Sequence, residues 1–234
     1  MALSCTKQNA FDCFKSNGKE TSETRYPGSF NELSVYDKID LTIVNGPEYK
    51  VEVIAGAHLL KSITTKVVNN VLIIENHNKC NFVRGYKKTI KIIVTVPKIA
   101  KVNNYGVGPI TFADGYKQDS LRIHIENSGD IHVNGQFTEI RSSSHGNGDI
   151  YLNGSAKSLL IYTNGLNYTF AENFIVSDYT YISTYSIGHV YFNFTGLTKF
   201  SYYIWSAGNI YYKGIPGTIE CLGGDGNGKL IKED

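Results

Sequence analysis

The chain has 234 residues and a formal net charge of +2 at pH 7, and charged residues make up 19% of it. This length can bury a core in one or at most two domains, and the low net charge gives no broad electrostatic attraction for nucleic acid. Twenty-three glycines and seventeen tyrosines favour strands and turns over helices, and no apolar stretch reaches the roughly 18 residues of a membrane-spanning helix.

The first segment, residues 1–28, is polar and lacks hydrophobic periodicity, so we expect a tail or linker there. Its Leu3-Ser4-Cys5 is similar to the end of a bacterial lipoprotein signal, although the charged and apolar parts of such a signal do not precede it. Either a longer export signal belongs in front of these residues, or the similarity is chance. The first alternative predicts a lipid anchor on Cys5 as the chain's only link to a membrane.

The number and spacing of the cysteines give weak support for an exported protein. With Cys5 lipidated, Cys13, Cys80 and Cys221 remain, which allows one disulfide and one free thiol. We favour a Cys13–Cys80 disulfide, which would hold the polar N-terminal segment against the first sheet. Three unrelated buried thiols are the other interpretation. No CxxC spacing is present, which argues against a structural zinc site.

A series of strands is predicted from Phe30 onward, because β-branched residues recur there, often at a period of two. Asn69-Asn70, between two of these runs, is typical of a hairpin turn. No window shows a convincing helical period, so the chain is predicted to be all-β. The expected strands are residues 38–44, 49–55, 62–68, 71–76 and 88–96.

A repeat begins after Pro97, in which a glycine is followed two residues later by an aliphatic residue. Six steps separate Gly108 from Gly228, a mean of about twenty residues each, which suits one coil of a parallel β-helix. Gly165 fits the pattern poorly, because Gly-Leu-Asn replaces the glycine-x-aliphatic form. The glycines are Gly108, Gly129, Gly148, Gly165, Gly188, Gly208 and Gly228.

The repeat predicts a single-stranded right-handed parallel β-helix, with a less regular sheet over residues 29–104 and regular coils over 105–234. Residues two and four positions after each glycine should face inward, because successive side chains on a strand point to opposite sides. In the twin heptads GDIHVNG (129–135) and GDIYLNG (148–154), the second and fourth residues therefore point outward.

Several stretches together resemble the family of "Putative auto-transporter adhesin, head GIN domain" proteins. They are NAFDCFKSNG, IDLTIVNGPEYKVEVIAG, NKCNFVRGYKKTIKIIVTVPKI, the recurring glycine-x-isoleucine turns and the closing GNIYYKGIPG. The resemblance covers roughly residues 9–234 and rests on a distributed pattern. It implies an exported β-solenoid of the bacterial cell envelope, largely found in Bacteroidetes, with no established biochemical activity. It also supports lipidation of Cys5.

Two outward columns are rich in aromatic residues and are the candidate ligand-binding surface. One stands three residues after each glycine and the other three residues before it, and sixteen of the chain's twenty-nine aromatic residues lie within 162–212. Such rows suit the apolar faces of a sugar or a protein partner, but they can also simply stabilise neighbouring strands. If Gly165 marks a change of register, Tyr168 leaves the column and interrupts it. The candidate residues are Tyr151, Tyr162, Tyr185, Tyr191, Trp205 and Tyr211.

Signals for chemistry are weak. Asp130 and Asp149 hold equivalent places in consecutive coils, so they either repel, share a proton or bind a cation; a metal or acid–base role is the less favoured interpretation, since aspartate is ordinary beside a turn glycine. His124, His132 and His145 should be surface residues. Glu126 is expected beside His145 as a solvated pair. No nucleophile or phosphate-binding motif is present, and no cofactor is predicted.

Three functions follow in order of preference. The first is a non-enzymatic cell-envelope protein, located at the outer membrane or the extracellular surface, that presents its aromatic rows to a glycan or protein partner. The second is a structural envelope protein that self-associates, with a homodimer as its simplest form. The third is an enzyme acting on polysaccharides, because β-helices also host lyases and hydrolases.

Overall fold

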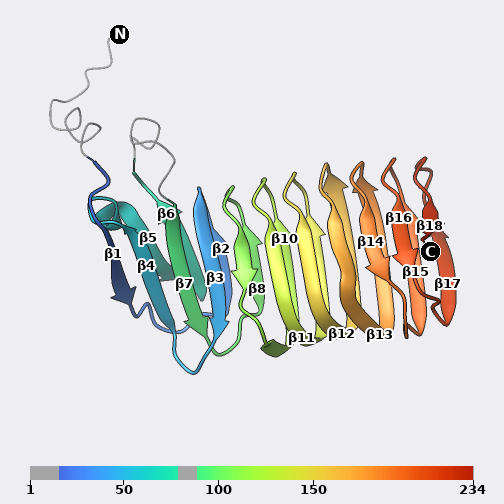
Figure 1. The fold of residues 1–234 in the computed structure, drawn as a ribbon, viewed down its shortest axis with the longest axis horizontal. Helices are drawn as coiled ribbons and strands as arrows, with labels where there is room; N and C mark the ends of the chain where they lie inside the picture. Colours follow the sequence, from blue (N-terminus) through green and yellow to red (C-terminus); the bar gives the residue numbers. More distant parts are fainter. Residues whose placement is uncertain (1–15, 79–88, 234) are drawn as a thin grey trace, which may run out of the picture.

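The computed structural model describes residues 16–78 and 89–233. They form a β-solenoid of about seven turns, each of roughly 20 residues, with a curled sheet at the N-terminal end (Figure 1). Within the described residues the chain has no α-helix, and its only helical element is the 3₁₀ turn Leu60–Ser62. The predicted fold class is therefore confirmed. The cysteines Cys5, Cys13 and Cys80 lie outside the described residues.

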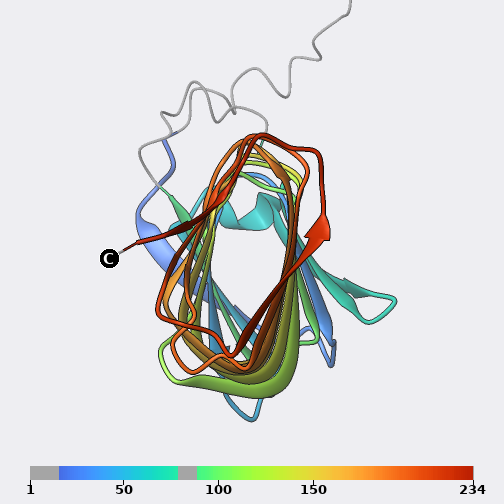
Figure 2. The ribbon, with the colours of Figure 1, turned by 90° about the vertical axis from the view of Figure 1, so that its right-hand side faces the viewer.

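Each turn is flattened, so the solenoid has two long faces joined by an upper and a lower corner (Figure 2). The long strands β11 (Ile131–Ser144), β12 (Ile150–Gly165) and β13 (Thr169–Ser186) bend through the lower corner and contribute to both faces. The other strands of the first face are β1 (Glu20–Arg25), β4 (Lys50–Gly56), β7 (Ile90–Val96), β3 (Ile39–Asn45), β9 (Ile110–Phe112), β14 (Val190–Asn193), β16 (Ile210–Lys213) and β18 (Leu230–Lys232). The other strands of the second face are β5 (Ile63–Val68), β6 (Val71–Asn76), β2 (Glu32–Val35), β8 (Lys101–Asn104), β10 (Tyr116–Ile125), β15 (Lys199–Ile204) and β17 (Thr218–Gly223).

The N-terminal end does not follow chain order. β2 lies between β6 and β8, and β3 lies between β7 and β9, all in parallel pairing. β4, β5 and β1 then pack antiparallel onto β7, β6 and β4. Asn69 and Asn70 both have positive φ, 50° and 65°, and close the expected hairpin between β5 and β6. The expected strands of this region are found within one or two residues of their predicted bounds.

Strand β1 corrects one expectation, because residues 20–25 were expected to belong to a polar tail. The strand pairs with β4 along its whole length, from Glu20 opposite Gly56 to Arg25 opposite Val51. All six residues are exposed or only partly buried, so the strand needs no apolar pattern. Backbone hydrogen bonds to the edge of β4 hold the strand in place. Because no alternating apolar side chains are needed, the pattern of side chains along the sequence does not predict it.

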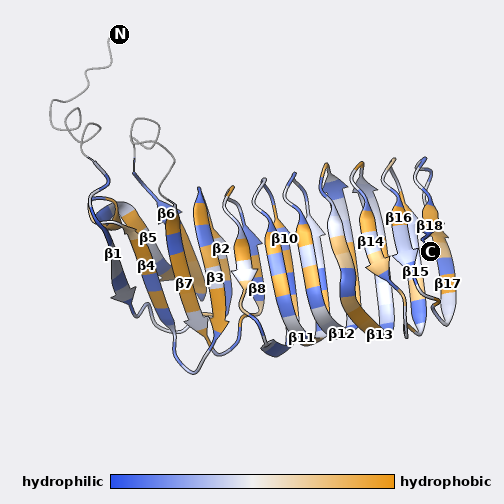
Figure 3. Cartoon of the chain, viewed as in Figure 1, coloured by the Kyte–Doolittle hydropathy of each residue, from blue (hydrophilic) through white to orange (hydrophobic). Residues whose placement is uncertain are grey.

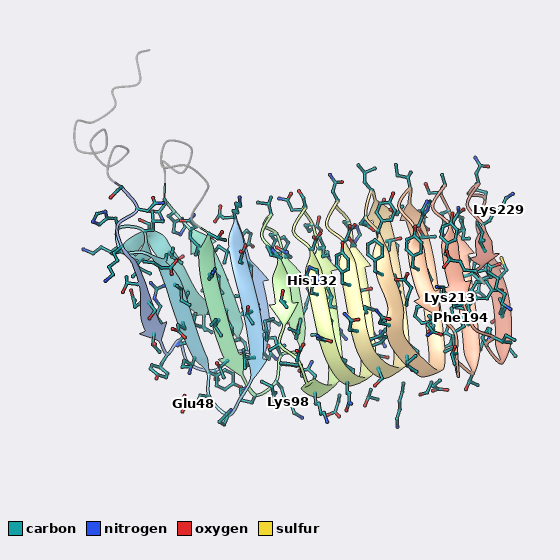
Figure 4. The ribbon with its side chains drawn as sticks, in the orientation of Figure 1. Glu48, Lys98, His132, Phe194, Lys213 and Lys229 are labelled. Carbon is teal, nitrogen blue, oxygen red and sulfur yellow. The ribbon has the colours of Figure 1, made fainter. Side chains whose placement is uncertain are left out.

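The core is one continuous stack of inward columns. Ile131 pairs with Ile110 on one side and Ile150 on the other, and all three are fully buried. Figure 3 shows the resulting alternation of apolar and polar bands along the strands. At the upper corner the backbones of successive coils approach closely: a Cβ on Gly148 would lie 2.4 Å from the carbonyl oxygen of Gly129, so only glycine fits. Lys229 marks the upper corner of the last coil (Figure 4).

One coil departs from the predicted register. The place of the corner glycine is taken by Asn167 and not by Gly165, because Gly188 stacks on the carbonyl of Asn167. Thr169, two residues later, occupies the inward column between Ile150 and Val190. The Asn167 side chain donates hydrogen bonds to the carbonyls of Gly146 and Asn164, which fixes this alternative corner.

Candidate binding surface

Five stacked rings form a row on the first face, which we call the first aromatic row. Its members stand opposite one another in parallel register, one per coil. Successive ring centroids are 4.4, 4.8, 5.4 and 5.2 Å apart, with interplanar angles of 9°, 14°, 1° and 11°. The coil spacing of about 4.8 Å thus places each ring within stacking distance of the next. The row is His132, Tyr151, Phe170, Tyr191 and Tyr211.

The register change leaves this row intact. Tyr168 leaves the column, as expected for a slip at Gly165, but Phe170 takes its place, so the expected interruption does not occur. Tyr168 instead flanks the row, with its ring 6.1 Å from Phe170 and 5.6 Å from His189. Three candidate residues, Tyr151, Tyr191 and Tyr211, are therefore brought together.

Stacking decides what the first row presents to solvent. Each inner ring has a neighbouring ring on both faces, so the ring edges and hydroxyl groups point outward while the faces are covered. Burial raises the pKa of Tyr151, and the nearby carboxylates of Asp149 and Asp130 raise it further. Burial also raises the pKa of Tyr191, with Tyr211 adding to the effect. The phenols of Tyr151 and Tyr191 therefore remain neutral donors near pH 7.

A second aromatic row runs along the other side of the upper corner, mainly on the second face. Its rings come from two neighbouring columns, and successive centroids are 5.0–6.0 Å apart. Tyr162 was expected in the column of Tyr185 and Trp205, but it pairs with Ser183, two positions earlier. Its ring nevertheless lies 5.5 Å from Tyr185. The row is Tyr36, Tyr105, His124, His145, Tyr162, Tyr185 and Trp205.

The upper corner itself is held by side chains that accept hydrogen bonds from the next coil. Asp130 Oδ1 accepts from the backbone N–H of Asp149 at 2.8 Å, and Asp149 Oδ1 accepts from that of Tyr168 at 2.7 Å. Asn209 Oδ1 does the same for Lys229 at 2.9 Å. Both aspartates thus satisfy backbone donors that the sharp turn leaves unpaired.

The electrostatics of the aspartate pair agree with this structural role. Burial raises the pKa of Asp149 above its ordinary value, and the neighbouring Asp130 also raises it, while the hydrogen bond from Tyr168 opposes the shift. No group of three or more histidine, cysteine, aspartate or glutamate side chains suited to a metal ion is found within residues 16–78 and 89–233. The two carboxylates alone give a cation few ligands.

The candidate acid–base groups lie in the expected columns, but their side chains contact other partners. Glu126 and His145 directly follow the paired residues Ile125 and Ser144, so they lie opposite each other in adjacent coils as expected. Glu126 Oε1, however, lies 2.9 Å from Nε2 of His124 on its own coil. His145 instead contacts the hydroxyl of Ser143 at 2.8 Å. Arg122 and Arg141 stand opposite each other in adjacent coils, and Arg141 is paired with Glu139 at 2.7 Å. These pairs lie along an exposed sheet surface.

A feature that sequence reasoning missed lies at the upper corner between the two rows. Residues immediately before the corner glycine, or before Asn167 in its place, project from this edge, and in two consecutive coils they are Leu166 and Ile187, which are 52% and 55% exposed. Tyr168, Tyr185 and Trp205 beside them are 37–41% exposed. The residue before each corner glycine could have revealed this feature in the sequence. Leu166 was overlooked because Gly165 was taken as the corner glycine of its coil, and Leu166 follows Gly165.

Two further observations concern the remaining cysteine and membrane-spanning helices. Cys221, the thiol left over in the expected pairing, is free and exposed on β17. In the described part of the chain no helix is long and apolar enough to cross a membrane.

The family model described as "Putative auto-transporter adhesin, head GIN domain" matches residues 29–216. The chain belongs to this family. Membership of this adhesin family places the chain among surface or exported proteins. No curated protein matches the chain.

Solved structures similar to this head GIN domain protein share its fold. A putative adhesin from Bacteroides fragilis NCTC 9343 has a TM-score of 0.80 and 23% identity, covering 92% of this chain and 97% of that one. A putative lipid binding protein from Parabacteroides distasonis ATCC 8503 has a TM-score of 0.70 and 17% identity, covering 94% and 98%. A putative adhesin from Parabacteroides merdae ATCC 43184 has a TM-score of 0.65 and 16% identity, also covering 94% and 98%. At these identities the likeness concerns the fold alone.

Proposed function

We propose that this head GIN domain protein is a non-enzymatic adhesin of the bacterial cell envelope, held to the membrane by a lipid on Cys5, that binds a protein partner along its first aromatic row. The observation that carries the proposal is the unbroken stack from His132 to Tyr211 on one exposed face. Tyr162, Tyr185 and Trp205 belong to the second row, on the other side of the upper corner from this contact. Tyrosine and tryptophan are the residues most enriched at the energetic centres of protein interfaces.

The choice of a protein over a glycan rests on ring orientation. Sugars bind aromatic residues mainly by stacking an apolar sugar face on an apolar ring face. In the first row the interplanar angles are at most 14°, so neighbouring rings cover those faces. What remains is a strip of ring edges and phenol hydroxyls, which suits the mixed polar and apolar surface of a protein. An enzymatic role is disfavoured because the acids described above form isolated pairs or bond backbone amides.

Adherence of protein-coated beads to intact mammalian or bacterial cells tests the proposal. Pretreating the cells with trypsin should abolish adherence, whereas periodate oxidation of their sugars should leave it. The double variant Tyr191→Ala/Tyr211→Ala should reduce adherence about tenfold or more, since truncating hot-spot aromatics costs at least 2 kcal/mol. Tyr26→Ala, which removes an aromatic residue that is 70% exposed on another part of the surface, is the matched control.

Three results would contradict the proposal and identify its rivals. Sensitivity to periodate instead of trypsin, with binding on a glycan array, would identify a carbohydrate partner. A dimer that forms with increasing concentration and is lost in the double variant would indicate self-association through the row. Turnover of a polysaccharide that disappears in Asp130→Asn or Asp149→Asn would indicate an enzyme.

A further inference from the structure

The upper corners of consecutive coils differ sharply in charge. The corners at residues 126–130, 145–149 and 225–229 read ENSGD, HGNGD and DGNGK, and each carries at least one formal charge. The three corners between them, at 164–168, 185–189 and 205–209, read NGLNY, YSIGH and WSAGN, and they carry none when His189 is neutral. We call these three corners the apolar edge. They are successive in space, since Ile187 N–H donates to the carbonyl of Gly165 and Gly208 N–H to that of Ser186.

The apolar edge has aliphatic residues at its crest and aromatic residues on both sides of the crest. Its crest consists of Leu166, Ile187 and Ala207, which are aliphatic and exposed. Tyr185 and Trp205 form one shoulder, stacked 5.5 Å apart, and Tyr168 with His189 forms the other. Leu166 and Ile187 are 52% and 55% exposed, whereas the tyrosine and tryptophan rings of the shoulders are 37–41% exposed. Tyrosine and tryptophan prefer the boundary between acyl chains and lipid headgroups.

We propose that the apolar edge inserts into the interface of a lipid bilayer. This contact goes beyond the proposed adhesion through the first row. The upper corner of the solenoid is convex (Figure 2). A convex corner needs no matching groove in a lipid surface, because the lipid surface deforms around it. A second copy fits less well, since a narrow crest of three small corners buries far less than the roughly 800 Å² per partner of a stable interface. Uncharged corners avoid the cost of bringing a formal charge into the interface.

The position of the first described residues agrees with this orientation. The described chain begins at the same edge of the solenoid as the upper corners (Figure 1), where the carbonyl of Ser16 contacts Nδ1 of His58 at 2.7 Å. Cys5 precedes Ser16 by eleven residues, a span of at most about 40 Å when fully extended. A lipid on Cys5 would thus tether the molecule from the side on which the apolar edge lies. A small apolar contact and one lipid together give the two signals that stable membrane attachment requires.

Trp205 makes the proposal directly measurable, because it is the only tryptophan in the chain and is 38% exposed on the apolar edge. Full-length protein without lipid on Cys5 is mixed with vesicles of zwitterionic phosphatidylcholine. We expect a blue shift of the tryptophan emission and quenching by phosphatidylcholine brominated on its acyl chains. Leu166→Ser/Ile187→Ser should raise the lipid concentration needed for half-maximal shift about tenfold or more, because it removes most of the inserted apolar surface.

Val107→Ser is the matched control, because Val107 occupies the same corner position and is 48% exposed. Its corner stands alone between the charged corners that contain Asp37 and Glu126, so this variant should bind vesicles as the wild type does. Thermal unfolding confirms that both variants fold. Tyr191→Ala/Tyr211→Ala should also retain vesicle binding, so failure of the adhesion proposal and failure of this one are separable.

Four outcomes would overturn the proposal. The first is an emission spectrum that vesicles leave unchanged. The second is a blue shift that appears without lipid, grows with protein concentration and is lost in Leu166→Ser/Ile187→Ser, which would identify a second copy as the occupant. The third is an equal loss of binding in Val107→Ser. The fourth is much stronger binding when phosphatidylglycerol is added, since that would indicate a contact driven by charge.

Discussion

Phe200 and Ile219 are neighbours in one inward column, yet Phe200 is fully buried whereas 45% of Ile219 is exposed. The difference separates the middle coils from the last one. A middle coil has another coil on each side, and the last coil has one on a single side. Burial in this fold therefore depends less on the position within a coil than on the number of neighbouring coils, as expected for a molecule that is nearly one-dimensional.

The two ends of the solenoid differ in what covers their outermost strands. At the N-terminal end, β1, β4 and β5 cover the stack in antiparallel pairing. At the other end, β17 and β18 pair inward with β15 and β16, and no further strand of the described residues lies against them. Here the register is broken opposite Tyr202 and Tyr203, and Lys232 occupies the inward column after Tyr212. Short strands, a bulge and an inward lysine all discourage pairing with another chain.

The largest expected effect concerns one inward column in the two regions. Ile150→Ala should lower the free energy of unfolding by about 2–5 kcal/mol, because Ile150 is fully buried between two coils. Leu230→Ala, in the same column of the last coil, removes a side chain that is only partly buried and should cost less than half as much. Urea unfolding followed by circular dichroism measures both. Equal losses would show that the last coil is packed as firmly as the middle ones.

The upper-corner glycines should show the same contrast at a smaller scale. In Gly148→Ala the new Cβ would lie 2.4 Å from the carbonyl of Gly129, which forces two inner coils apart and should cost about 1–3 kcal/mol. Gly228→Ala meets the carbonyl of Gly208 at 2.2 Å, but the last coil can shift outward. We expect a smaller decrease in melting temperature for Gly228→Ala. The reverse order would mean that corner spacing is set by something other than backbone contact.

A buried hydroxyl in a middle coil offers a gain in stability. Thr169 occupies the aliphatic column between Ile150 and Val190, and its Oγ1 is buried without a hydrogen-bond partner among the described residues. Thr169→Val keeps the shape and removes the unpaired group, so it should raise the free energy of unfolding by about 1–2 kcal/mol. Thr218→Val, on the exposed β17, should change it little. A loss in Thr169→Val would reveal that the hydroxyl is satisfied, for example by a buried water.

The inward columns could be predicted from the sequence because period-two alternation and a glycine every twenty residues are local patterns. Most of the first aromatic row followed from them. The pattern wrongly predicted Gly165 as a corner residue. The corner is defined by the close approach of two backbones, and Asn167 fits there because its side chain makes its own hydrogen bonds. Two bulges in the pairing of β12 with β13 then absorb the extra residues of the next coil. Neither is visible in residue type alone.

Two other misses have related causes. The sequence predicted a less regular sheet over residues 29–104 without a strand order. The placement of β2 between β6 and β8, and of β3 between β7 and β9, depends on the pairing of distant strands, which local patterns do not reveal. Tyr162 was placed by counting back from Gly165, so the same error moved it into the wrong column. Its contact with Tyr185 survives because long rings reach across neighbouring columns.

The smallest expected effect tests the aspartates at the upper corner. Because burial raises the pKa of Asp149 above its ordinary value in the folded state, its contribution to stability is present at low pH and is lost as pH rises through the folded-state pKa. Asp149→Asn keeps an oxygen acceptor for the N–H of Tyr168, as Asn209 does for Lys229, and removes the repulsion from Asp130. The variant should therefore be more stable than the wild type by about 0.5 kcal/mol at pH 7. At about pH 3, where the carboxyl is largely protonated, the two should unfold alike.

Asp225→Asn, at the exposed corner of the last coil, should change little at either pH. A loss of stability in Asp149→Asn at pH 7 would instead mean that the negative charge itself holds the corner, as a cation bound between Asp130 and Asp149 would require.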